Sequence, residues 1–197
     1  MNKLSLFSGI GGIDLAAKMS GFETETFCEI EKYPAEVLKR RFPGKKIIND
    51  VREIDGRDFK GIDLISGGFP CQPFSVAGKR KGEFDERHLF PEMARIIFEA
   101  RPQWVVAENV AGLFSIPNER GIRGGVLGDC ISRLSQMGYA LGWCCFGAVD
   151  VGAPHRRNRI FIIANKDKER VRKVIEYVTC NLTPWEGASW PTPTVTS

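Results

Sequence analysis

Cys71 is the residue of this sequence best placed to act as a nucleophile. It stands in the run GGFPCQPFS (residues 67–75), after an apolar stretch that predicts a β-strand over residues 62–66. Pro70 and Pro73 restrict the backbone on both sides of the thiol and hold it in a fixed direction. A thiolate at the carboxyl end of a strand lies where open α/β sheets place their ligands. The same run is equally compatible with a structural loop cysteine, so other residues must decide.

A carboxylate ends a second apolar strand. Residues 104–107 are Trp-Val-Val-Ala, and Glu108 follows them directly. A glutamate after four apolar residues is not typical of a solvated surface charge. Glu108 is therefore a candidate general acid, or a group that hydrogen-bonds to the edge of a base. The alternative is a structural carboxylate that caps the next loop.

Two arginines introduce the last predicted strand. Arg157 and Arg159 differ by two positions at the start of the apolar run 159–164, so they should share a face of the strand, and Arg156 should point elsewhere. Two guanidinium groups on one face could bind carbonyl oxygens or phosphate groups bidentately. A basic strand end in solvent is the alternative.

A glycine-rich turn follows the first predicted strand and leads into a helix. Its residues, FSGIGG (7–12), let a ligand approach the backbone closely at a helix N-terminus. Asp14 occupies the third glycine position of the G-x-G-x-x-G pattern, which is therefore incomplete. Glu29 ends the second strand twenty residues after Gly9, where doubly wound folds place the carboxylate that binds a ribose diol. A nucleoside-bearing cofactor is expected.

Short strands that alternate with helices must position these residues. Strands are predicted over residues 3–7, 24–30, 46–49, 62–66, 104–107, 139–146 and 159–164. Helices are predicted after residue 12, from Pro34 to before Gly44, over about 86–100, around 127–134 and over 168–178. This alternation predicts an α/β fold with a largely parallel sheet that helices cover on both faces.

Length and composition predict one globular domain. The 197 residues are 43% hydrophobic and 26% charged, with a formal net charge of +4 that permits a polyanionic partner. The domain is expected over residues 1–180, and residues 181–197, rich in proline and tryptophan, are expected to be a linker or the start of a missing region. Without an apolar span or signal-peptide layout, a cytoplasmic location is expected. Six cysteines with no C-x-x-C pair argue against a zinc site.

Together these elements resemble the cytosine-C5 DNA methyltransferase family. The resemblance lies, in order and spacing over about residues 3–165, in Phe7-x-Gly9-x-Gly11-Gly12, Pro70-Cys71-Gln72, Leu89-Phe90-x-Glu92-x-x-Arg95, Glu108-Asn109-Val110 and Arg157-x-Arg159. It implies a Rossmann-like, S-adenosylmethionine-dependent methyltransferase fold, with a mostly parallel seven-stranded sheet and one antiparallel strand.

The resemblance also implies S-adenosylmethionine as the cofactor. Glu29 would bind the ribose hydroxyls, Ile30 would lie against the adenine, and Asp50 would contact the adenine amino group. Phe7 would pack beside the cofactor, and the backbone of residues 9–12 would meet its amino-acid end. The full set of expected cofactor-binding residues is Phe7, Ser8, Gly9, Gly11, Gly12, Glu29, Ile30, Asp50, Val51, Gly68 and Pro70.

The implied reaction is methylation of cytosine C5 in double-stranded DNA. Cys71 would attack C6, Glu108 would stabilise the ring protonated at N3, and Arg157 and Arg159 would hold O2 and the phosphate. Because a stacked base is out of reach, the cytosine must be flipped into the site. Residues 76–88 would close over it. The expected substrate-binding residues are Gln72, Ser75, Lys79, Arg80, Lys81 and Asn109.

Two departures from the family pattern leave alternatives open. His155 stands where many members carry Gln, and both can donate a hydrogen bond. The family's target-recognition region and its returning Asn-Ser or Asn-Ala segment have no counterpart, so we expect a truncated chain or a second polypeptide, and otherwise a monomer. The rival functions are methylation of cytosine C5 in tRNA and a catalytically silent nucleic-acid-binding or partner-binding fragment. Asp14 and the reactive cysteine disfavour a nicotinamide-dependent oxidoreductase.

Overall fold

The computed structural model describes residues 1–70, 89–117, 120–122 and 124–181. The predicted residues that lie outside this description are Cys71, Gln72, Ser75, Lys79, Arg80 and Lys81, together with the whole segment 76–88. The boundary expected at residue 180 adjoins such a stretch and stays a prediction.

Within the described residues, seven strands form one mixed sheet in the order β3-β2-β1-β4-β5-β7-β6. The strands are β1 (Asn2–Leu6), β2 (Glu23–Cys28), β3 (Lys46–Ile48), β4 (Leu64–Gly68), β5 (Trp104–Val110), β6 (Ala140–Phe146) and β7 (Arg159–Asn165). β1 pairs in parallel with β2 and β4, β2 pairs in parallel with β3, and β6 and β7 are antiparallel. The predicted α/β fold and all seven predicted strands are confirmed.

Five α-helices and four short 3-10 helices connect these strands in the described ranges. The α-helices are α1 (Gly12–Met19), α2 (Lys32–Arg41), α3 (Phe90–Ala100), α4 (Gly125–Gln136) and α5 (Lys168–Asn181). The 3-10 helices are η1 (Val51–Glu53), η2 (Gly56–Phe59), η3 (Ala111–Phe114) and η4 (Ala148–Val151). No helix in this part of the chain has the length and apolar character needed to cross a membrane.

By its contacts the chain divides into two compact units. The first consists of residues 1–70 and 88–107, and the second of residues 71–87 and 108–197. β1 to β4 and α1 to α3 belong to the first unit. α4, α5, β6 and β7 belong to the second, and β5 is divided after Ala107.

The first unit has its core along β1, which is buried on both faces from Lys3 to Leu6. α1 starts after Gly11, whose φ of 84° is in the left-handed region that glycine adopts without strain. A Cβ at Gly11 would also lie 2.7 Å from a ring carbon of Phe42 on the far end of α2. The turn between β1 and α1 therefore requires glycine for both conformation and space.

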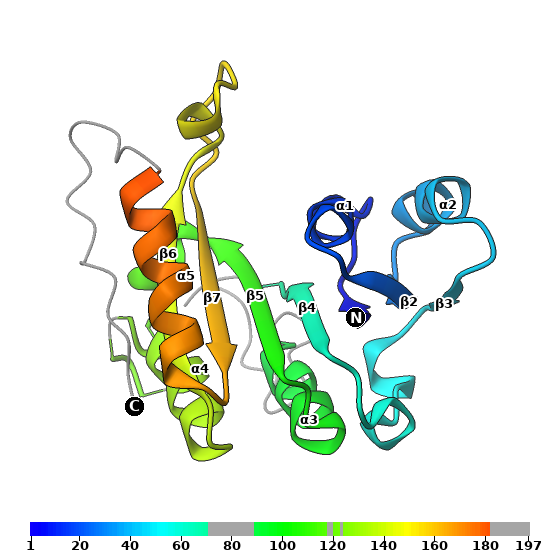
Figure 1. Ribbon diagram of the computed structural model, residues 1–197, viewed down its shortest axis with the longest axis horizontal. Helices are drawn as coiled ribbons and strands as arrows, with labels where there is room; N and C mark the ends of the chain where they lie inside the picture. The colour runs from blue at the N-terminus through cyan, green and yellow to red at the C-terminus, as the bar shows by residue number, and fades with distance from the viewer. Residues whose placement is uncertain (71–88, 118–119, 123, 182–197) are drawn as a thin grey trace. The chain divides into compact units, whose positions relative to one another are not determined.

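In the second unit, α5 lies along β6 and β7 (Figure 1). The approach is close at Gly142 on β6, where an added Cβ would be 2.5 Å from Cγ1 of Ile175 on α5. On the same two strands, the ring of Phe146 on β6 stacks on that of Phe161 on β7, with their centroids 4.6 Å apart. Gly142 is thus a packing requirement of the α5–β6 contact.

This contact predicts a specific stability difference between two glycines of the second unit. Gly142→Ala should lower the free energy of unfolding by about 1 to 3 kcal/mol, because it overpacks the contact with Ile175. Gly128→Ala is the control, since a Cβ there meets nothing within 4 Å and alanine favours the helix by up to about 1 kcal/mol. Urea unfolding of both variants measures the difference, and equal stabilities would contradict the packing account.

Candidate active site

The turn after β1 is fastened to the end of β2 by the carboxylate of Glu29. Oε2 of Glu29 accepts a hydrogen bond from the Gly9 N–H at 2.6 Å, and Oε1 accepts one from the Glu31 N–H at 2.9 Å. Glu29 is only 7% exposed. Each carboxylate oxygen has two lone pairs, so both oxygens can accept a further bond from a ligand hydroxyl.

Ser8 and Phe7 complete this turn. The Ser8 N–H donates to the Cys28 carbonyl oxygen at 3.0 Å, and its hydroxyl lies 3.2 Å from the carbonyl oxygens of Ser5 and Cys28. Phe7 and Gly9 both have positive φ, 51° and 54°. The turn therefore bends sharply into α1, whose first-turn N–H groups have no partner within the helix itself.

Ile30 and Asp50 each lie two residues past the end of a strand, β2 and β3 respectively. Oδ1 of Asp50 caps η1 by accepting from the Arg52 N–H at 2.9 Å and pairs with Arg52 Nε at 3.1 Å. Val51 is buried, whereas Ile30 is 63% exposed. A hollow of about 440 Å³ is lined by Ile30, Lys32, Ala35, Glu36, Lys39 and Asn49. This hollow includes Ile30 but neither Glu29 nor Asp50, the two carboxylates predicted to bind the cofactor. It therefore extends toward α2 rather than across the glycine turn.

Gly68 and Pro70 mark the point where the chain leaves β4. A Cβ at the preceding residue, Gly67, would lie 2.4 Å from the Leu6 carbonyl oxygen, so β4 requires glycine beside β1. Phe69 is buried and its ring lies 5.1 Å from that of Phe90 on α3, while Pro70 is exposed. The stretch described up to residue 70 is thus anchored at Phe69, two residues before Cys71.

A buried polar cluster around Asp14, in the first turn of α1, was not predicted from the sequence. Lys3 Nζ pairs with Oδ1 of Asp14, and both side chains are fully buried. The Thr24 hydroxyl donates to the same oxygen at 3.0 Å, and the Ser5 hydroxyl donates to Oδ2 at 3.1 Å. Burial lowers the pKa of Lys3, and the attraction of Asp14 opposes this shift without reversing it. The sequence signal for this cluster was Lys3, an ionisable residue in the first predicted strand.

This Lys3–Asp14 cluster positions α1. Asp14 lies in the first turn of α1, Lys3 and Ser5 lie on β1, and Thr24 lies on β2. Asp14 was recognised only as the residue that breaks the G-x-G-x-x-G pattern. The structure shows that it ties the start of the helix to both strands that carry the glycine turn and Glu29.

Glu108 and Arg159 form an ion pair in the second unit. Arg159 Nε lies 2.7 Å from Glu108 Oε1, and the two side chains are 22% and 24% exposed. Arg159 Nη1 also donates to the Asn158 carbonyl oxygen at 2.9 Å. Asn109 is buried, and its side-chain oxygen accepts from the Val110 N–H at 2.8 Å. Two residues selected separately from the sequence therefore meet, one from β5 and one from β7.

The position of Arg157 differs from the prediction. β7 begins at Arg159, and Arg157 lies before it, exposed and with a positive φ of 36°. The prediction that Arg157 and Arg159 share a face of a strand is wrong, because alternation applies only inside a strand. The loop turns here because the Arg156 carbonyl oxygen accepts from the Ala148 N–H at 2.7 Å.

The described cysteines are poor candidates for a nucleophile. Burial raises the pKa of Cys28 and of Cys144 to about 12, and that of Cys145 to about 11. Cys130 is fully buried. Cys28, Cys130 and Cys144 are buried core residues and Cys145 is half-buried, and a thiolate is disfavoured at the three with raised pKa.

The chain is similar to known methyltransferases along most of its length. The family model described as C-5 cytosine-specific DNA methylase matches residues 1–196. Type II methyltransferase M2.BsuMI of Bacillus subtilis (strain 168) is 37% identical over 170 residues, which are 84% of this chain and 42% of the relative. Type II methyltransferase M.HhaI of Haemophilus parahaemolyticus is 35% identical over 161 residues, 81% and 47% of the two chains.

Solved structures agree with these relatives. A structure from Escherichia coli, attributed to a DNA modification methyltransferase encoded within a prophage, has a TM-score of 0.70 and 30% identity over 86% of this chain and 48% of its own. A DNMT2 variant of Spodoptera frugiperda has a TM-score of 0.69 and 27% identity, over 84% and 50% of the two chains. The chain spans about half the length of the relatives it matches.

The Lys3–Asp14 cluster predicts unequal effects of single and double replacement. Asp14→Leu should lower the free energy of unfolding by about 3 to 5 kcal/mol, because it leaves the Lys3 charge buried without its partner. The double variant Lys3→Met with Asp14→Leu should recover most of that loss, because apolar groups then fill the site. Urea unfolding tests both, and a double variant no more stable than Asp14→Leu would contradict the pairing.

Proposed function

Since the chain belongs to the C-5 cytosine-specific DNA methylase family, we propose that it forms the catalytic part of a DNA (cytosine-5-)-methyltransferase that uses S-adenosylmethionine. The observation that carries this proposal is the Glu108–Arg159 ion pair. It joins the carboxylate assigned to acid chemistry with an arginine assigned to orienting the base, within one unit of the chain.

The first unit fits a nucleoside-bearing cofactor. Glu29 presents a nearly buried carboxylate with remaining acceptor capacity, which suits the two hydroxyls of a ribose. The glycine turn and the start of α1 offer N–H groups for the carboxylate of an amino-acid end. Phe7, Ser8, Gly11, Gly12, Ile30, Asp50, Val51, Gly68 and Pro70 complete the set of residues proposed to hold it. When bound, S-adenosylmethionine would supply an electrophilic methyl group.

The chain's own residues would activate the cytosine. The Cys71 thiolate adds to C6, which moves electron density to C5 and makes C5 nucleophilic. Glu108 accepts the hydrogen bond of the ring protonated at N3, and this contact stabilises the charge that the addition develops. After C5 is methylated, a base such as water takes the C5 proton, the electron pair of that C–H bond restores the C5–C6 double bond, and Cys71 leaves as the thiolate.

Arg159 has a double role in this proposal. Its guanidinium holds the direction of the Glu108 carboxylate, and its remaining N–H groups can reach a carbonyl oxygen such as O2 of the base. Arg157, exposed before the strand, is proposed for the flanking phosphate, where a free guanidinium is useful. Gln72, Ser75, Lys79, Arg80, Lys81 and Asn109 are proposed to contact the flipped nucleotide and its strand.

The covalent step can be trapped. The complete protein, incubated with S-adenosylmethionine and DNA that carries 5-fluorocytosine, should accumulate a stable protein–DNA adduct, because fluorine cannot leave C5 as the proton does. Denaturing gel electrophoresis and mass spectrometry of the linked peptide would place the bond on Cys71.

Cys71→Ala is the matched control for this adduct, and it should abolish the adduct while S-adenosylhomocysteine binding is retained. No adduct with DNA from a folded, cofactor-binding protein would contradict the proposal. An adduct with fluorinated tRNA alone would support the tRNA alternative instead.

The Glu108–Arg159 pair predicts a loss of rate without a loss of cofactor binding. Glu108→Gln should lower kcat by about 10²- to 10⁴-fold, because a neutral amide stabilises the N3-protonated ring poorly. The Kd for S-adenosylhomocysteine should change less than twofold, since Glu108 is not among the proposed cofactor ligands. Glu176→Gln on α5 is the control, because it also removes a carboxylate paired with an arginine but far along the sequence from the site. Equal rates for both variants would overturn the assignment of Glu108.

A further inference from the structure

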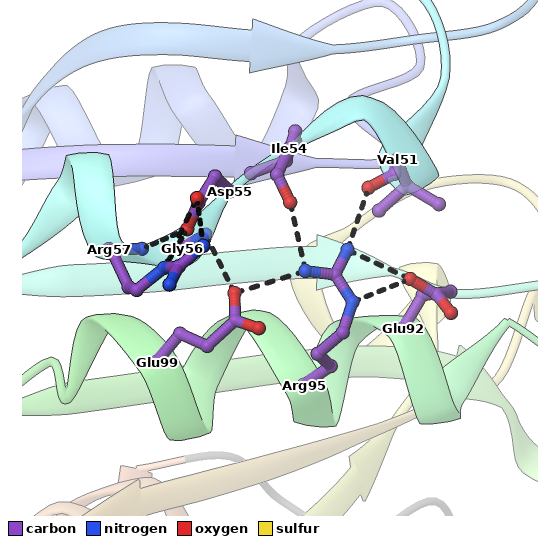
Figure 2. A network of polar contacts seen from close by, with 8 residues as sticks. All are labelled: Val51, Ile54, Asp55, Gly56, Arg57, Glu92, Arg95 and Glu99. Atoms are coloured by element: carbon purple, nitrogen blue, oxygen red, sulfur yellow. Dashed lines mark hydrogen bonds and ion pairs between the residues drawn. The ribbon is translucent and has the colours of Figure 1, made fainter.

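Arg95 on α3 joins the helix to the segment that follows Asp50. Its Nη1 donates to the Ile54 carbonyl oxygen at 2.9 Å, and its Nη2 donates to the Val51 carbonyl oxygen at 3.4 Å. Glu92 and Glu99 flank it on the same helix, with Nε–Oε2 at 2.9 Å and Nη1–Oε2 at 3.0 Å (Figure 2). The guanidinium thus lies between two carboxylates and two main-chain carbonyls.

Glu99 fastens the far end of the same segment. Its Oε2 accepts from the Gly56 N–H at 2.8 Å, so Arg95 and Glu99 together hold residues 51–56 at three backbone positions (Figure 2). A Cβ at Gly56 would lie 2.7 Å from both Cβ of Glu99 and the Ile96 carbonyl oxygen. The segment therefore lies directly against α3, and its position depends on the helix.

The position of Asp50 follows from that of the segment. Asp50 caps η1, and its carboxylate is bound to both the N–H and the Nε of Arg52 in that helix. Val51, the next residue, carries one of the two carbonyls that Arg95 binds, and it is buried. Loss of Arg95 would leave the carbonyls of Val51 and Ile54 without this donor and would release the turn that orients Asp50.

Arg172 on α5 shows what an ordinary helical arginine pair looks like in this protein. It too has a glutamate three residues before it and another four residues after it, Glu169 and Glu176, at 2.9 Å each. In the described part of the chain its hydrogen bonds go to these two side chains and to no main-chain carbonyl. The contacts with Val51 and Ile54 therefore set Arg95 apart from a surface ion pair, which contributes little to stability.

We propose that Arg95 is a positioning residue that sets the base specificity of the cofactor site, by fixing the turn that carries Asp50. This inference rests on the proposed function, in which Asp50 accepts a hydrogen bond from the adenine amino group. A carboxylate held in place favours an amino group and disfavours the oxo group of hypoxanthine at that position. A carboxylate on a loosened turn discriminates less, because it can move away from the oxo group.

The test compares two ligands in the complete protein by isothermal titration calorimetry. S-Adenosylhomocysteine and S-inosylhomocysteine differ at the C6 group that Asp50 is proposed to contact and at the adjacent N1, which carries a hydrogen in hypoxanthine. We expect the wild-type protein to bind the adenine ligand at least tenfold more tightly. Arg95→Met should reduce this ratio to less than threefold, whereas the matched control Arg172→Met should keep it.

The conservative pair Arg95→Lys and Arg172→Lys guards against a variant that fails to fold. A lysine can reach one carbonyl but not both, so Arg95→Lys should lower the ratio several-fold and Arg172→Lys should leave it unchanged. A purely structural role would weaken both ligands equally and leave the ratio intact.

The remaining outcomes distinguish a failure of the role proposed for Arg95 from a failure of the proposed function. A wild-type ratio that survives in both Arg95 variants overturns the role of Arg95 and leaves the proposed function standing. A wild-type protein that binds both ligands equally also overturns it, since no base specificity then exists to be set. A folded protein that binds neither ligand contradicts the proposed function itself, and the role of Arg95 fails with it.

Discussion

The carboxylate of Glu29 receives hydrogen bonds from Gly9 on one side and Glu31 on the other, and it thereby fixes the glycine turn against the end of β2. This arrangement constrains the first unit, because Glu29 and the hydrogen bonds of Ser8 together hold a turn that has positive φ at Phe7 and Gly9. The Lys3–Asp14 cluster also holds the glycine turn, because it ties the start of α1 to β1 and β2. The Arg95 contacts hold the next turn along the same edge of the unit.

The second unit depends on a comparable pairing. Glu108 and Arg159 are each about one-quarter exposed, so solvent screens their attraction and the pair contributes modestly to stability. Its value in the proposed function lies in orientation: each side chain limits the directions open to the other. The neighbouring Asn109 is buried, so this end of β5 is built from polar side chains that the core accepts only in bonded form.

The sequence predicted the fold well because short strand-forming runs alternate with helical segments along the chain. β5 extends three residues past its predicted end and β7 starts at its predicted residue, both within the error of element boundaries predicted from sequence. Local patterns could not predict the Glu108–Arg159 pair, since it depends on β5 and β7 being neighbours although α4 and β6 separate them in the chain. The Lys3–Asp14 cluster and the Arg95 contacts were missed for the same reason: each joins residues whose partners are fixed only by tertiary packing. Arg157 was misplaced because nothing in its residue type indicates a positive φ.

In the proposed function, this family member places a methyl group on carbon 5 of cytosine in DNA. The most direct measurement incubates the complete protein with DNA and S-adenosylmethionine that carries a trideuterated methyl group, digests the DNA to nucleosides and analyses them by mass spectrometry. The account predicts trideuteromethyl on C5 of deoxycytidine. Label on N4 of cytosine or on adenine, or no label from a protein that binds the cofactor, would contradict it.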